Sequence, residues 1–115
     1  MIHYYEKLEV WKQTVDLSLD IYKVLHNCKD YGLRDQMQRA AVSIPSNIAE
    51  GSQRNSDKEF IRFLNISKGS AAELNTQIII AFKLNYFPEA VYNKLRSKLK
   101  DILQMTSGLI ASLQK

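Results

Sequence analysis

The helical pattern of this chain is clearest in the segment Arg39-Ala-Ala-Val-Ser-Ile-Pro-Ser-Asn-Ile-Ala-Glu-Gly51. Pro45 lies inside this segment, has no N–H for the carbonyl of Ala41, and crowds that carbonyl with its ring. The apolar spacing nevertheless continues past Pro45, so the sequence predicts one continuous helix that is kinked at this residue. The face of this helix is marked by residues at steps of three and four: Leu33, Met37, Ala40, Ala41, Ile44, Ile48 and Gly51.

Working outward from this segment, the same spacing predicts three more helices. The first is expected from about residue 5 to 27, the second from about 31 to 53, the third from about 57 to 84, and the last from Pro88 onward. Asp30 is the expected N-cap of the second helix, and Ser56-Asp57-Lys58-Glu59 is a capping box that opens the third. Short connections between long helices favour antiparallel neighbours. The sequence therefore predicts an all-α, antiparallel up-down-up-down four-helix bundle.

Length and composition agree with this class of fold. A chain of 115 residues is expected to form a single domain, 1–115. The net charge of +4 permits contact with nucleic acid without requiring it. One cysteine excludes an internal disulfide, and the absence of a signal-peptide pattern predicts a cytoplasmic protein. No apolar run approaches the about 18 residues of a membrane-spanning helix, so no membrane partner is expected.

Five segments together resemble a known family. They are Leu8-Glu-Val-Trp11, the central Arg39–Gly51 segment, Lys58-Glu-Phe-Ile-Arg-Phe-Leu64, Gly69-Ser70 and Glu73-Leu74. Over nearly the whole chain the sequence is similar to the bacterial four-helix-bundle family of 23S rRNA intervening-sequence proteins. Some members of that family are encoded inside insertions in the large-subunit rRNA gene.

The resemblance carries expectations about assembly and partners. It implies a homo-oligomer, typically a pentameric ring of four-helix bundles, and no catalytic activity is established for the family. A more distant likeness is to the accessory variability proteins of diversity-generating retroelements, whose similar rings bind nucleic acid and a reverse transcriptase. By analogy, RNA or a nucleoprotein complex is the favoured partner. The alternative is a purely structural or protein–protein assembly scaffold without affinity for nucleic acid.

Enzymatic chemistry finds little support in the residues. Cys28 and His26 are two residues apart, which is not a distance that brings side chains together on a helix. Two histidines and one cysteine match no metal-ligand spacing, and no Gly-rich phosphate loop is present. The sequence therefore predicts no catalytic residues, no metal and no cofactor.

A polar set accompanies Pro45 on the second helix, and it has two interpretations. Its members are Arg39, Ser43, Asn47 and Glu50. They form either a pocket for a ligand or RNA backbone, or a buried network that supports the kink and fixes helix pairing. The second interpretation is favoured, because buried polar networks commonly specify packing.

Basic side chains form two groups that are candidates for phosphate contact. Either group has the spacing to track phosphates, but an ordinary solvated helix face is the favoured interpretation of both. The first group, at steps of four, is Arg54, Lys58 and Arg62; the second, on the last helix, pairs Lys94 with Lys98 and Arg96 with Lys100.

More apolar side chains are present than one bundle core requires, which predicts an oligomer interface. On the first helix, the expected inner stripe is Leu8, Trp11, Val15, Tyr22 and Leu25, with a second stripe of Val10, Leu17, Ile21 and Val24 beside it. On the third helix, three isoleucines follow one another at 78–80, so at least one must face away from the core. The interface candidates are Ile21, Val24, Ile79 and Ile80. Gly69, in the interior of the third helix, is expected to pack closely against a bulky neighbour.

Overall fold

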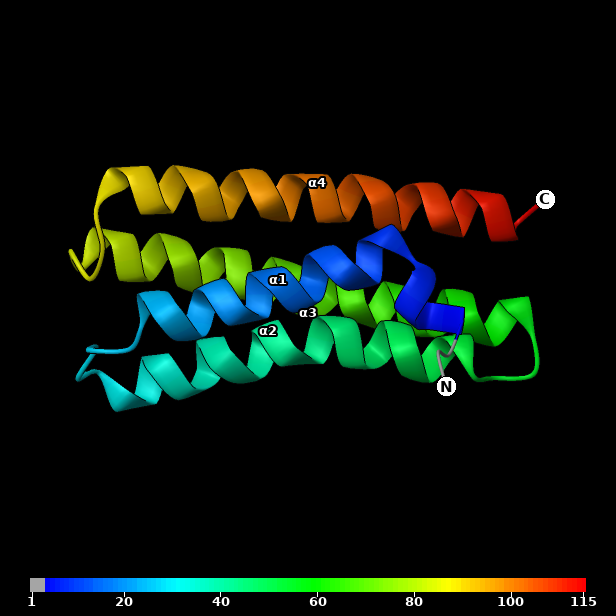
Figure 1. Cartoon of the computed structure of the whole chain (residues 1–115), viewed down its shortest axis with the longest axis horizontal. Helices are drawn as coiled ribbons and strands as arrows, with labels where there is room; N and C mark the ends of the chain where they lie inside the picture. Colours follow the sequence, from blue (N-terminus) through cyan, green and yellow to red (C-terminus); the bar gives the residue numbers. More distant parts are fainter. Residues whose placement is uncertain (1–3) are drawn as a thin grey trace.

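The chain forms four long helices. The computed structural model describes residues 4–115, which contain α1 (Glu9–Val24), α2 (Tyr31–Ser52), α3 (Asp57–Lys83) and α4 (Glu89–Leu113), preceded by a short 3-10 helix η1 (Tyr4–Lys7). No strand occurs among these residues. Figure 1 shows each long helix running opposite to the one before it. The predicted all-α four-helix bundle is therefore confirmed.

The helix starts follow from local chemistry that the sequence displays. The Asp30 carboxylate accepts a hydrogen bond from the Leu33 N–H at 3.1 Å, and the Ser56 hydroxyl accepts one from the Glu59 N–H at 3.2 Å. Each bond satisfies one of the backbone donors that an α-helix leaves free at its first turn. Pro88 precedes α4, where its missing N–H costs nothing.

The start of the first helix differs from the prediction. Leu8 has an extended backbone, with φ −74° and ψ 125°, and separates η1 from α1. The Leu8 N–H closes the preceding turn on the Tyr5 carbonyl at 3.0 Å. The Tyr5 ring then lies 5.4 Å from the ring of Trp11. This aromatic contact forms because the chain turns back at Leu8, so the α-helix is shorter than the apolar pattern indicates.

The second of the two predicted apolar stripes supplies most of the buried face of α1, although Leu25 of the first stripe is buried as predicted. Leu17 and Ile21 are fully buried in the core, whereas Tyr22 is exposed. Two small polar residues that the apolar pattern leaves out, Thr14 and Ser18, are buried on the same face. Their hydroxyls bond backbone carbonyls, so α2 can approach this face closely. Ile21 is therefore wrong as an interface candidate, because its side chain is buried within the subunit.

Helix α2 continues through Pro45 without interruption, as predicted. The Ala41 carbonyl, which Pro45 cannot serve, lies 3.1 Å from the Ser18 hydroxyl of α1, whose one hydrogen it shares with the Thr14 carbonyl at 3.0 Å. From the other side, the Ser67 hydroxyl of α3 donates to the Ile44 carbonyl at 2.9 Å. The neighbouring helices thus satisfy the backbone around the proline. The bend expected at Pro45 stays a prediction.

The closest packing in the bundle lies between α2 and α3. A Cβ atom on Gly51 would stand 2.5 Å from the Cβ of Phe63, which no relaxed structure tolerates. This pair of helices makes the most extensive contact, and α1 with α4 the least extensive of the pairs of long helices that touch. The core contains, among others, Leu17, Ile21, Met37, Ile44, Ile48, Leu64, Leu74, Ile78, Leu95, Leu99 and Ile102. No helix within residues 4–115 is both long and apolar enough to cross a membrane.

Candidate functional site: the polar cluster and the basic surfaces

The polar set predicted around Pro45 divides into two parts. The Asn47 side-chain amide donates to the Ser43 carbonyl at 2.8 Å and to the Ser43 hydroxyl at 3.0 Å. The Ser43 hydroxyl also lies 2.9 Å from the hydroxyl of Ser70 on α3. All three side chains are half-buried between α2 and α3. Their hydrogen bonds are made with one another and with backbone, which favours the structural interpretation of this cluster.

Arg39 and Glu50 do not join that cluster, and their inclusion in a buried network is wrong. Both side chains are exposed. The Glu50 carboxylate pairs with Arg54 at 2.9 Å instead. No hydrogen bond or ion pair of Arg39 is found within residues 4–115. The helical spacing of Arg39 and Glu50 is compatible with contact, but both lie on the solvent side of α2.

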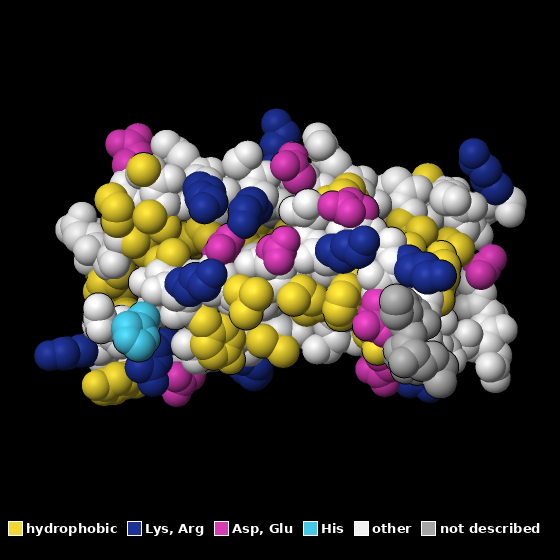
Figure 2. Space-filling view, viewed as in Figure 1, with side chains coloured by type: hydrophobic (Ala, Val, Ile, Leu, Met, Phe, Trp, Pro, Cys, Tyr) yellow, Lys and Arg dark blue, Asp and Glu magenta, His cyan; other side chains and the backbone are white. Residues whose placement is uncertain are grey.

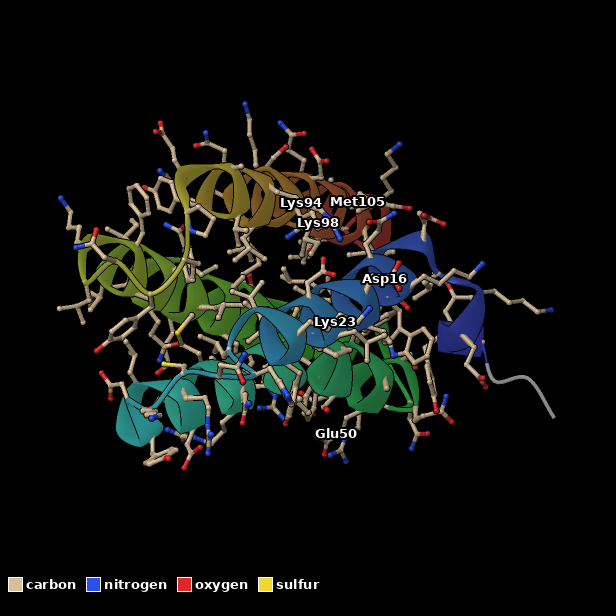
Figure 3. All side chains as sticks on the ribbon, turned by 60° about the vertical axis from the view of Figure 1, so that its left-hand side comes forward. Asp16, Lys23, Glu50, Lys94, Lys98 and Met105 are labelled. Carbon is tan, nitrogen blue, oxygen red and sulfur yellow. The ribbon has the colours of Figure 1, made fainter. Side chains whose placement is uncertain are left out.

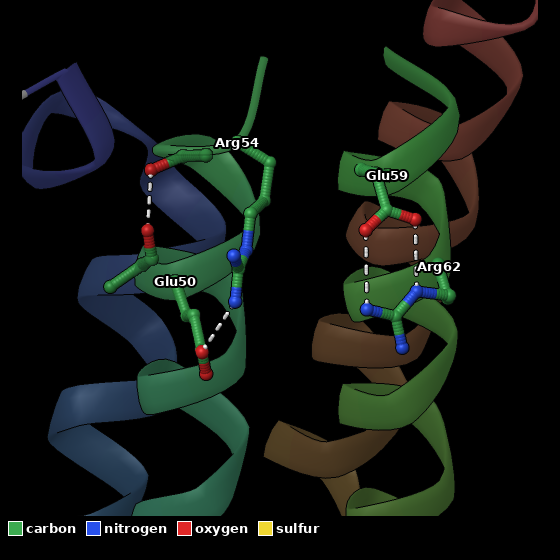
Figure 4. Close-up of polar contacts among 6 residues, drawn as sticks. Glu50, Arg54, Glu59 and Arg62 are labelled. Atoms are coloured by element: carbon green, nitrogen blue, oxygen red, sulfur yellow. Dashed lines mark hydrogen bonds and ion pairs between the residues drawn. The ribbon is translucent and has the colours of Figure 1, made fainter. Parts of the chain in front are cut away.

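The first basic group is largely neutralised by its own neighbours (Figure 4). Arg54 pairs with Glu50 at 2.9 Å, and Arg62 pairs with Glu59 through two bonds of 3.0 and 3.2 Å. The hydrogen bond from Arg62 lowers the pKa of the Glu59 carboxyl, and the same bond raises the pKa of Arg62. Lys58 is exposed without an ion pair among the described residues. The charges of both arginines are therefore matched by carboxylates.

Arg54 and Arg62 also share an aromatic contact. Their guanidinium carbons lie 4.9 and 4.6 Å from the centroid of the Phe63 ring. Arg54 itself stands after the end of α2, so it is not part of the α3 ridge that its spacing suggested. The planar guanidinium groups cover an otherwise apolar ring, a role in packing that lysine would not fill as well.

The second basic group is split between two sides of α4. Lys98 forms an ion pair with Asp20 of α1, and both side chains are half-buried. Lys94 lies one turn earlier on the same side and is exposed (Figure 3). Figure 2 shows a face of the bundle on which basic, acidic and apolar side chains are interspersed rather than sorted into one basic field.

Arg96 and Lys100 lie on the other side of α4, along a groove shared with α3. The groove has a volume of about 1040 Å³. None of the described residues that line it is Asp or Glu. Its lining residues are Ala72, Asn75, Thr76, Asn93, Arg96, Ser97, Leu99, Lys100, Leu103, Gln104 and Ser107.

Neutral groups hold Arg96 in this groove. Its Nε donates to Asn75 Oδ1 at 3.2 Å, and its Nη1 donates to the Tyr92 hydroxyl at 2.8 Å. The Tyr92 ring in turn stacks on Phe82 of α3, with centroids 4.2 Å apart and planes at 15°. A spacing of four on α4 pairs Arg96 with Tyr92 as well as with Lys100, but the sequence gives no signal for Asn75. The contact of Arg96 with Asn75 joins α4 to α3, so only the folded chain reveals it.

Apolar side chains that the core does not use are spread over several helices. Ile78 is fully buried, Ile79 is half-buried, and Ile80 is 45% exposed. The prediction that one of the three faces away from the core is therefore confirmed for Ile80. Val24 is half-buried against the core. The other exposed large apolar side chains include Leu19, Tyr22, Val42, Ile66 and Leu84.

The described part of the chain contains no cluster of side chains suited to a metal ion. No group of three or more His, Cys, Asp or Glu side chains that could hold a metal ion occurs among residues 4–115. Cys28 is half-buried in the connection between α1 and α2. His3, one of the two histidines of the chain, lies outside the described residues.

Comparison with known proteins identifies a family and a solved structure with a similar fold. A family model described as the 23S rRNA-intervening sequence protein matches residues 6–108. The chain belongs to this family. A crystal structure of a protein with unknown function from the S23 ribosomal protein family of Bacteroides thetaiotaomicron VPI-5482 is similar in fold, with a TM-score of 0.82. The two are 25% identical, and the match covers 88% of this chain and 97% of the other. Curated proteins yield no match.

Proposed function

We propose that this chain is a non-enzymatic, homo-oligomeric protein that binds RNA through its phosphates. The observation that carries the proposal is the charge of α4. Lys94 and Lys100 are exposed and Arg96 lines a groove, and no ion pair within residues 4–115 involves any of them. Unpaired cations on a surface are the groups that displace counterions from a phosphate backbone. The family description, which refers to 23S rRNA, points to RNA as the nucleic acid.

The homo-oligomeric part of the proposal is supported by exposed apolar side chains. Ile80, in the last turn of α3, and Leu84, the residue that caps its C-terminal end, lie one turn apart and are 45% and 50% exposed. Exposed apolar patches on monomeric proteins often mark interfaces. The pentameric ring and the binding of a nucleoprotein complex remain expectations that come from the family resemblance. The non-enzymatic part rests on the sequence, which offers no nucleophile–base pair. The cytoplasmic location stays a prediction.

A second candidate function, an assembly scaffold without affinity for nucleic acid, is favoured by the internal ion pairs. Arg54, Arg62 and Lys98 are each matched by a carboxylate, which lowers the charge available to a partner. On this alternative, the exposed apolar side chains would carry the whole function, and α4 would be an ordinary solvated helix.

The deciding experiment is a binding titration with fluorescent RNA at two salt concentrations. RNA binding predicts that affinity falls steeply between 50 and 200 mM salt, because each phosphate contact releases bound counterions. The triple variant Arg54→Ala, Lys58→Ala and Arg62→Ala tests the first basic group. Because both arginines are already paired with carboxylates, we expect the salt dependence of RNA affinity to change by little more than the contribution of Lys58. Absence of binding by the wild-type chain at 50 mM salt would leave the scaffold function ahead.

A further inference from the structure

We propose that the groove between α3 and α4 is the path of the RNA backbone, with Arg96 and Lys100 as its phosphate contacts. This inference rests on the proposed function and gives it a place on the molecule. The ligand chemistry is a phosphodiester chain, which single-stranded and duplex RNA both present.

Some of the candidate cations are paired with a carboxylate, and others are not. A cation that already holds a carboxylate must give up that partner to bind a phosphate, and so gains little. Arg54, Arg62 and Lys98 are in this position. Arg96 and Lys100 are not, and they lie one turn apart on the same side of α4. The groove therefore keeps its full positive charge of two.

Arg96 is held in the groove by two neutral groups. The Asn75 amide oxygen and the Tyr92 hydroxyl orient the guanidinium group without neutralising it. A guanidinium has five N–H donors, and these two bonds use two of them, which leaves three for a ligand. A fixed planar fork with free donors is well suited to bidentate contact with a phosphate. Orientation by neutral groups is what a phosphate site requires, because a carboxylate there would repel the ligand.

The other residues that line the groove also suit a phosphodiester chain. From Asn93 to Ser107 the α4 wall rises about 21 Å, long enough for more than one phosphate. Neutral polar side chains of both α3 and α4 line the groove beside the two cations, and Leu99 and Leu103 supply apolar surface. The neutral polar residues are Asn75, Thr76, Asn93, Ser97, Gln104 and Ser107. Such groups commonly contact phosphate and sugar in protein–nucleic acid complexes.

The test adds a carboxylate to the groove with almost no change of shape. Asn75→Asp keeps an acceptor oxygen for Arg96 but neutralises its charge and repels phosphate. Gln36→Glu adds the same charge at an exposed position of α2, which makes no contact with α4 in the described chain, and serves as the matched control. A second pair removes charge: Arg96→Gln with Lys100→Gln in the groove, against Lys12→Gln with Lys23→Gln at exposed positions of α1.

Each variant is titrated with a fluorescein-labelled 20-nucleotide RNA of mixed sequence, and separately with its 20-base-pair duplex. Asn75→Asp should lower affinity by about an order of magnitude at 0.1 M salt, and Gln36→Glu by much less. The double groove variant should reduce the slope of log affinity against log salt by about 1.4 for the single strand or about 1.8 for the duplex. The α1 pair should leave the slope nearly unchanged, and the larger wild-type affinity identifies which form of RNA is preferred.

The outcomes separate this inference from the proposed function. Wild-type binding that none of the groove variants weakens would overturn the groove but keep RNA binding. No wild-type binding at 50 mM salt would overturn both. Light scattering of Asn75→Asp provides the remaining check, because a fall in oligomeric mass would mean that the groove seats a second copy of the chain rather than RNA. Thermal unfolding shows whether each variant is folded, and Asn75→Asp preserves the bond that holds Arg96.

Discussion

Gly51 and Gly69 illustrate at the scale of single residues how differently two glycines inside helices behave. Gly51 is buried at the contact of α2 with α3, and a Cβ atom there would stand 2.5 Å from Phe63 Cβ and 3.1 Å from Phe60 Cδ1. Gly69 lies exposed in the interior of α3, and, beyond its adjacent residues and the surrounding backbone of its own helix, no described atom lies within 4 Å of the place that a Cβ would take. The bulky neighbour expected at Gly69 is therefore not supplied by the described subunit.

These two glycines predict opposite effects of the same substitution. Gly51→Ala should lower the free energy of unfolding by about 1–3 kcal/mol, because the added methyl overpacks the contact with Phe63. Gly69→Ala should raise it by about 0.5–1 kcal/mol, because alanine is the better helix former and meets no obstacle. Urea unfolding of both variants checks the pair. A loss of stability in Gly69→Ala would show that another copy of the chain approaches this position.

Ser18 and Pro45 are the clearest case in which two elements depend on each other. The Ser18 hydroxyl of α1 supplies the hydrogen bond that Pro45 cannot give to the Ala41 carbonyl of α2. Ser18→Ala should cost about 1–3 kcal/mol, because a buried carbonyl loses its partner. In a Pro45→Ala background the restored N–H serves that carbonyl, so the cost of Ser18→Ala should shrink. A double-mutant cycle by urea unfolding measures this coupling, and equal costs in both backgrounds would refute it.

A second contact between elements joins the α1–α2 and α3–α4 connections at one end of the bundle. The Tyr86 hydroxyl donates to Asp30 Oδ2 at 2.8 Å. This bond lowers the pKa of Asp30 from its ordinary value of 3.8, and the backbone bond from Leu33 lowers it further. The same bond to Asp30 raises the pKa of Tyr86 from its ordinary value of 10.0.

The signs of these two shifts define a pH window. A lowered carboxyl pKa adds stability above pH 3.8 that is lost as the pH falls through the folded value. A raised phenol pKa adds stability below pH 10.0 that is lost as the pH rises through the folded value. Tyr86→Phe should therefore be less stable than the wild type at pH 7, and the difference should narrow below pH 3.8 and above pH 10. Unfolding curves at pH 3, 7 and 10.5 test this, and a constant difference across the three would contradict it.

The elements also show what the sequence was able to predict. Helix starts at Asp30 and Ser56 depend on residues within one turn, so local chemistry located them correctly. The inner face of α1 depends on α2, whose close approach favours the small residues Thr14 and Ser18, and the apolar pattern alone chose the wrong stripe. The ion pairs Glu50–Arg54 and Glu59–Arg62 were readable from their spacing. The Asp20–Lys98 pair joins residues 78 positions apart, so only the folded chain reveals that Lys98 is matched.

At the scale of the whole molecule, the exposed apolar side chains at the C-terminal end of α3 favour assembly of the bundle into an oligomer. Ile80 and Leu84 do not pack into the core of the subunit, yet burying one such side chain is worth roughly 1.5–3 kcal/mol. Several of them per subunit would hold an oligomer together. We therefore expect light scattering at micromolar concentration to give a mass several times 13.3 kDa.

The double variant Ile80→Glu with Leu84→Glu should shift that mass toward the monomer, because two carboxylates would have to be buried without partners. Asn65→Glu, at an exposed polar position of the same helix, should leave the mass unchanged. Both variants should keep their helical circular dichroism, since the substituted side chains lie outside the core of the subunit. A wild-type chain that stays monomeric at micromolar concentration would remove the support for a ring. RNA binding would then depend on the cations of a single α4 helix, and its salt dependence would be correspondingly shallow.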